Sequence, residues 1–253
     1  MALCVAAVCP HPPLLIPAVA GSAAAHGQDL LSACDAAVRS LLAAEPEVVL
    51  VAGDAPDRFD ADTDAVGSLR DYGVDVRAGG GASAAEPTLP LACTIGAWLL
   101  DRAGWHGQRR YVGLPDTISA TQAGEIGAAA ARCAASVGLL AMGDGSARRT
   151  EQAPGYLDTR AAPFDASVAR ALAAADLDAL ARLDADLARQ LMVAGRATWQ
   201  VLAGACRAST HDRPDLLGWT GRVLADVCPY GVGYLVAVLE RTGQGVSRTD
   251  RYT

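Results

Sequence analysis

The sequence predicts an α/β fold with a central, mainly parallel or mixed sheet flanked by helices on both faces. Its 253 residues are enough for one self-sufficient core, so we expect a single domain over 1–253 with a flexible polar tail at 242–253. Hydrophobic residues make up 51% of the chain but aromatic residues only 5%, which favours closely packed layers of small side chains. Short apolar runs also alternate with segments of helical period, as in α/β proteins.

The first unit reads as strand, helix, strand. The apolar run 2–8 ends at a proline-rich segment, which is typical of a buried strand that enters a rigid loop. Apolar residues at helical spacing over 28–44 predict a helix. The run EVVLVA at 47–52 then predicts a second buried strand.

The same alternation continues to the end of the chain. The acidic segment 54–64 and the glycine-rich segment 78–87 are interpreted as turn and loop. Asp176 and Asp184 are placed to cap two helices. Further predicted strands are 110–114, 137–142 and 234–239, and further predicted helices are 89–103, 120–136, 164–173 and 194–207.

Composition excludes several classes of function. All 21 basic residues are arginine, and the net charge of −7 argues against non-specific nucleic-acid binding. No run approaches the roughly 18 apolar residues of a membrane span, and the apolar start lacks the positive region of a signal peptide. The seven cysteines form no CxxC pair, so reduced thiols are expected. We therefore expect a cytoplasmic protein without nucleic-acid or membrane partners.

Candidate site residues follow three of the predicted strands. In open α/β sheets, ligands bind at the carboxyl ends of the strands. His11 follows the first strand, Asp54 the second, and the loop 143–149 a later one. His11 could act in a cleft or hold the proline-rich loop by a hydrogen bond to a carbonyl, and Asp54 could instead cap a turn.

The loop 143–149, GDGSARR, adds Asp144, Ser146 and Arg148 to the candidates. Its backbone N–H groups, hydroxyl and guanidinium groups could bind a carboxylate or phosphate. Alternatively, Arg148 and Arg149 pair with nearby acidic residues and only fix the loop.

Several motifs resemble those of one family. CPHPPLLIP at 9–17, GDGSARR, the segment 153–180, AGRATWQVLAGA at 194–205 and PYGVGYLVAVLE at 229–240 are similar in order and spacing to the B-subunit domain of class III extradiol ring-cleavage dioxygenases and their Memo-like relatives. The resemblance implies the same α/β fold. It also implies a non-haem Fe(II) held by two histidines and a carboxylate.

The residues that match the family's site have mostly changed. His11 matches the first metal-binding histidine, but Asp54 stands near the position of the second. Ala147 stands where the family has its acid/base histidine, and the third ligand falls near 193–196, where neither valine nor alanine can bind a metal. The resemblance therefore implies a degenerate metal site with His11 as the only retained ligand.

We expect a dioxygenase-like protein without a metal cofactor or catalytic residues, which binds a small molecule or anion or serves as a partner subunit. A homodimer is also expected from the resemblance. The alternative is an active Fe(II) dioxygenase, or a related metalloenzyme, that recruits other ligands such as Asp54, Asp144 and Glu240.

Overall fold

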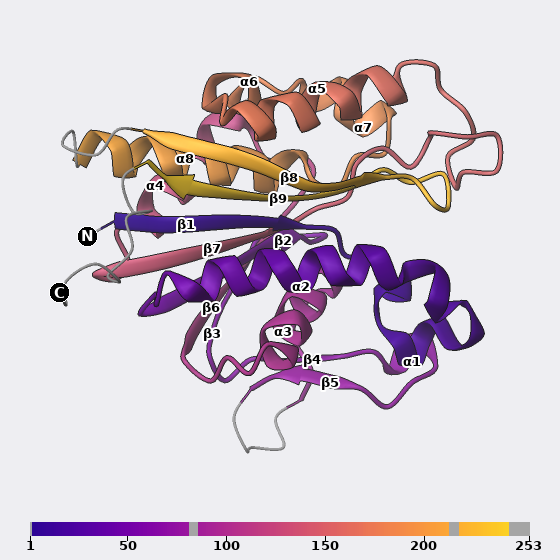
Figure 1. Cartoon of the computed structure of the whole chain (residues 1–253), viewed down its shortest axis with the longest axis horizontal. Coiled ribbons are helices and arrows are strands. Elements are labelled where there is room, and N and C mark those ends of the chain that lie inside the picture. The colour runs from indigo at the N-terminus through magenta and orange to yellow at the C-terminus, as the bar shows by residue number, and fades with distance from the viewer. Residues whose placement is uncertain (1, 81–85, 213–217, 243–253) are drawn as a thin grey trace, which may run out of the picture.

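A seven-stranded mixed sheet forms the centre of the molecule (Figure 1). The computed structural model describes residues 2–80, 86–212 and 218–242. The strand order is β3-β6-β2-β7-β1-β9-β8. The strands are β1 (Ala2–Cys9), β2 (Val48–Asp54), β3 (Phe59–Asp62), β6 (Gln108–Leu114), β7 (Ser136–Met142), β8 (Trp219–Val227) and β9 (Tyr234–Arg241).

The middle of the sheet is parallel and its margins are antiparallel. β6, β2, β7 and β1 run parallel, whereas β3 pairs antiparallel with β6 and β9 pairs antiparallel with both β1 and β8. A separate two-stranded sheet joins β4 (Val66–Ser68) and β5 (Arg77–Gly79). The fold class predicted from the sequence is confirmed.

Helices cover both faces of the sheet (Figure 1). One apolar core lies between the sheet and the pair α2 and α3, and a second lies between the sheet and the group α4, α5, α6 and α8, with Trp199 at 0% exposure. The longer helices are α2 (Gln28–Ala43), α3 (Leu91–Arg102), α4 (Ala120–Ala130), α5 (Ala161–Ala174) and α8 (Arg196–Asp212). The short elements are η1 (Pro13–Leu15), α1 (Pro17–Ala20), η2 (Gly21–Gly27), η3 (Arg70–Tyr72), α6 (Leu177–Ala181) and α7 (Ala185–Gln190).

Local sequence signals explain several helix ends. The Asp176 carboxylate accepts a hydrogen bond from the Ala179 N–H, and the Asp184 carboxylate accepts one from the Leu187 N–H, so both predicted caps are confirmed. The helix expected over 120–136 is shorter, because α4 ends at Ala130 and β7 already begins at Ser136. An alanine-rich segment favours a helix but contains no signal for its end.

Four strands were missed: β4 and β5 of the separate two-stranded sheet, and β3 and β8 at the two edges of the central sheet. β3 falls in the acidic segment interpreted as a turn, and its side chains alternate between half-buried and exposed. β8 is only partly buried along its length. Edge strands lack the continuous apolar run by which central parallel strands are recognised.

The last described residue, Thr242, is hydrogen-bonded to the rest of the fold. The Thr242 N–H donates to the Gly218 carbonyl, and the rest of the tail predicted at 242–253 lies outside the described residues. None of the helices in the described part of the chain is long and apolar enough to cross a membrane.

Candidate functional site

Three strand ends bring the predicted site residues together. β7 lies between β1 and β2, and all three strands are parallel. Their carboxyl ends therefore lie side by side, with His11 two residues past β1, Asp54 at the end of β2 and Asp144 two residues past β7.

His11 lies between the two carboxylates. Its imidazole Nε2 is 2.9 Å from Oδ1 of Asp54, and its Nδ1 is 3.6 Å from Oδ1 of Asp144. The backbone N–H of His11 also donates to Oδ1 of Asp144 at 2.8 Å. The side chains of His11 and Asp144 are largely buried, whereas that of Asp54 is 43% exposed. The cluster therefore reaches solvent through Asp54.

This arrangement favours the charged form of His11. Burial lowers the pKa of His11, but the charges of Asp144 and Asp54 and the contact with the Asp54 carboxylate outweigh it and raise the pKa to about 9. Burial raises the pKa of Asp144. Burial also acts to raise the pKa of Asp54, but the contact with His11 outweighs it and lowers that pKa. At neutral pH the cluster is an imidazolium held between two carboxyl groups.

The donor set does not fit the Fe(II) centre that the resemblance implies. Both ring nitrogens of His11 face carboxylates of the protein itself, so a metal would have to displace a proton that these carboxylates stabilise. Within the described residues, no group of three or more His, Cys, Asp or Glu side chains could hold a metal ion.

Glu240 cannot complete this cluster. β9 runs antiparallel to β1, and Glu240 pairs with Val5, whereas Ala237 pairs with Val8. Glu240 therefore lies toward the amino end of β1, away from His11. The suggestion that it replaces a lost metal ligand was wrong.

Ser146 and Arg148 are held by contacts that fix their own loop, and neither lines the cavity beside Asp54 that is described below. Ser146 is fully buried, and its hydroxyl donates to the Leu191 carbonyl at 2.7 Å and accepts the Arg148 N–H at 3.1 Å. The Arg148 guanidinium donates to the Gln190 carbonyl at 2.9 Å. These groups hold the loop 143–149 against the end of α7.

A buried carboxylate fixes the same loop. Asp165 of α5 is fully buried, accepts the Ser146 N–H at 2.9 Å and pairs with Arg149 at 2.8 Å. The expectation that Arg149 fixes the loop therefore holds, with Asp165 as a partner that sequence proximity did not suggest.

The loop in turn positions the start of α8. The Gly195 N–H donates to the Asp144 carbonyl at 2.8 Å. A Cβ atom on Gly143 would lie 2.4 Å from Cα of Gly195, so this close approach requires glycine. The carboxyl end of β7 and the amino end of α8 are thereby held together.

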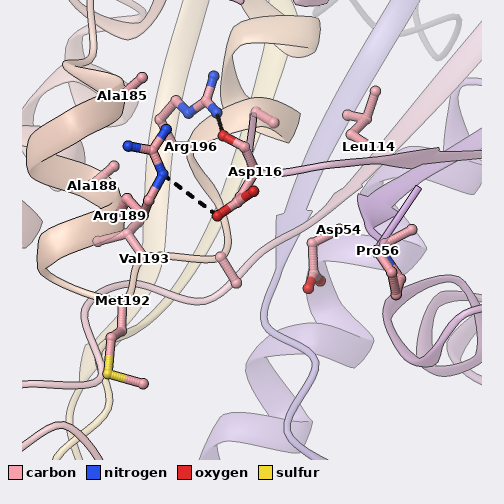
Figure 2. A pocket seen from close by; sticks show the side chains of 13 residues that line it. Asp54, Pro56, Leu114, Asp116, Ala185, Ala188, Arg189, Met192, Val193 and Arg196 are labelled. Carbon is pink, nitrogen blue, oxygen red and sulfur yellow. Dashed lines mark hydrogen bonds and ion pairs between the residues drawn. The ribbon is translucent and has the colours of Figure 1, made fainter. Parts of the chain in front are cut away.

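A cavity of about 470 Å³ opens beside Asp54 (Figure 2). Asp54 and Pro56 lie on one wall, and Arg189, Met192 and Val193 lie on the opposite wall. The remaining lining residues are Ala55, Leu114, Asp116, Ala185, Ala188, Ala194, Arg196 and Ala197. The volume lies within the range of roughly 300–1,000 Å³ that is usual for small-molecule sites.

Two arginines converge on Asp116 at this cavity (Figure 2). Arg189 Nε lies 3.6 Å from Oδ2 of Asp116, and Arg196 Nη2 donates to the Asp116 carbonyl oxygen. None of these three residues was among the site residues predicted from the sequence. Asp116 follows the strand β6 by two residues, so the strand-end rule that found His11 could have found it.

Comparison with known proteins supports the fold alone. No protein-family model matches the chain, and no curated protein matches it. A solved structure described as "uncharacterized protein JW3007 from Escherichia coli K12" has a similar fold, with a TM-score of 0.52 and 13% sequence identity over 94% of this chain and 99% of that chain. At this identity the likeness defines a shared α/β architecture, which does not determine an activity.

Proposed function

We propose that this protein is an extradiol-dioxygenase-like protein that binds a small molecule without metal chemistry. One observation carries the proposal: both ring nitrogens of His11 face carboxylates of the chain, at the strand ends where the family would place its metal. In this proposal the ion cluster takes the place of the family's metal centre.

The cavity beside this cluster supports binding. Asp54 is the member of the cluster that lines it, so a ligand would meet a carboxylate that accepts hydrogen bonds from a hydroxyl or amino group. Met192 and Val193 supply apolar surface for an organic body. A few polar groups within an apolar lining are typical of ligand sites. Assembly into a homodimer, or with a partner subunit, remains part of the proposal.

A fragment screen by ligand-observed NMR tests the proposal. Ala185 lines the cavity at the start of α7, and Ala185→Trp should fill it and abolish the signals of bound fragments. Ala174→Trp is the matched control, because Ala174 is exposed at the end of α5 and does not line the cavity. Fragments that bind wild type and the control but not Ala185→Trp are expected. Equal binding to all three proteins, or to none, would refute a ligand site in this cavity.

Metal content separates the proposal from the alternative metalloenzyme. Elemental mass spectrometry of protein purified without air should find no stoichiometric iron, including after iron is added back and excess is removed. Stoichiometric iron that is lost in Asp54→Asn would instead establish a metal site with non-standard ligands.

A further inference from the structure

A buried arginine at the cavity lacks a carboxylate partner. Arg196 is 3% exposed, and its guanidinium donates to the Ile118 carbonyl at 2.7 Å, to Oε1 of Gln200 at 2.9 Å and to the Asp116 carbonyl. All three acceptors are neutral and use three of its five N–H donors. Across the described ranges no carboxylate forms an ion pair with it. Burial lowers the pKa of Arg196 and the charge of Arg189 lowers it further, whereas the charge of Asp116 acts to raise it without reversing the shift. A buried charge without a counterion is costly.

The amino end of α8 adds uncompensated N–H groups at the same place. Ala194, Arg196 and Ala197 line the cavity. The backbone N–H groups of Arg196 and Ala197 have no acceptor among the residues that the structure describes. Gly195 precedes the helix and has no side chain that could cap its N–H groups. A larger residue does not fit there, because a Cβ atom would lie 2.2 Å from Cζ2 of Trp199. The end of this 17-residue helix therefore presents partial positive charge to the cavity.

A second guanidinium is available from α7. The Arg189 side chain is 47% exposed and is held by Asp116 at 3.6 Å and by Asp186 at 2.8 Å. Both of these carboxylates are mostly exposed, so their ion pairs with Arg189 are weak and displaceable.

We propose that the cavity takes an organic oxyanion, a carboxylate or a phosphate monoester, whose negative group lies at the amino end of α8 between Arg196 and Arg189. This inference rests on the proposed small-molecule function and specifies its ligand class. The bound anion supplies the counterion that Arg196 lacks and accepts the N–H groups of the first turn of α8. Its organic body lies against Met192 and Val193. Arg189 exchanges Asp116 for the ligand.

Calorimetric titration with three probes of similar shape tests the inference. Benzoate carries a carboxylate, phenyl phosphate carries a phosphate, and benzyl alcohol is neutral, all at constant ionic strength set with sodium chloride. At least one of the two anions should bind wild type about tenfold more tightly than benzyl alcohol, which corresponds to one charged hydrogen bond. The anion that binds identifies which oxyanion the site prefers.

Two arginine variants locate the anion. Arg189→Gln should weaken the anion about tenfold and leave benzyl alcohol unchanged. Arg182→Gln is the control, because Arg182 is an exposed arginine that pairs with Asp178 and does not line the cavity. Arg196→Gln should weaken the anion at least as much, and Arg189→Gln carries the test if that buried variant does not fold.

Three outcomes would overturn the inference, and they differ in what they say of the proposed function. Benzyl alcohol that binds as tightly as both anions, and is blocked by Ala185→Trp, would leave a ligand cavity but remove its anion preference. Equal anion binding by Arg189→Gln and Arg182→Gln would place the anion elsewhere. If none of the probes binds and the fragment screen is also negative, both proposals fail.

Discussion

Replacement of His11 by glutamine should remove a pH-dependent part of the stability. In the folded protein the pKa of His11 is about 9, against an ordinary value of 6.5. One pKa unit corresponds to about 1.4 kcal/mol, so the charged form of His11 contributes about 3 kcal/mol to the free energy of unfolding.

The sign follows from the direction of the pKa change. Because the folded-state pKa is raised, the contribution is fully present below pH 6.5. It decreases as the pH rises from 6.5 and is lost above about pH 9. The difference in unfolding free energy between wild type and His11→Gln should therefore fall by about 3 kcal/mol between pH 6 and pH 10.

Urea unfolding followed by circular dichroism at a series of pH values measures this difference. The comparison of the two proteins cancels the titration of cysteines and tyrosines, which both proteins share. His106→Gln is the control for a histidine-to-glutamine substitution at an exposed position. A difference for His11→Gln that is constant from pH 6 to pH 10, or that grows with pH, would refute the imidazolium cluster.

Two further predictions concern the loop 143–149 and the start of α8. Asp165→Asn leaves Arg149 without its buried partner and should lower the free energy of unfolding by about 3 kcal/mol in urea titrations; a loss below 1 kcal/mol would contradict this role. Gly195→Ala places a methyl group against Trp199 and should destabilise by about 2 kcal/mol. Gly124→Ala is its control in the same titrations, because the new methyl group in α4 meets nothing within 4 Å and should be neutral or stabilise by about 0.5–1 kcal/mol; equal effects of the two glycine variants would refute the packing argument.

The sequence was sufficient for the central sheet because central strands are apolar on both faces. The runs at 47–52 and 137–142 could be recognised without knowledge of their neighbours, and they lie almost completely within β2 and β7. The edge strands β3 and β8 have mixed burial, so their sequences look like turns or loops. Their identity depends on the strand beside which they lie.

From the sequence, only those site residues that closely follow a parallel strand could be predicted. The strand-end rule placed His11, Asp54 and Asp144 correctly because the direction of a parallel strand fixes where its next residues lie. The strand-end rule failed for Ser146, because an isolated β-bridge to Val193 fixes the orientation of this residue.

The arginines of the cavity wall were missed for a related reason. The folding of α7 and α8 against the sheet brings Arg189 and Arg196 to Asp116, which is far from them in sequence. No local sequence pattern predicts this contact.

The protonation state of His11 tests the central claim most directly. Nitrogen-15 NMR of the imidazole side chains at pH 7.5 distinguishes protonated from lone-pair nitrogens, and His11→Gln assigns the signals. We predict that both His11 nitrogens are protonated and that their signals do not change when Zn(II) is added as a diamagnetic substitute for Fe(II). A lone-pair nitrogen on His11 that shifts on addition of Zn(II) would contradict the account and show that the strand ends still form a metal site.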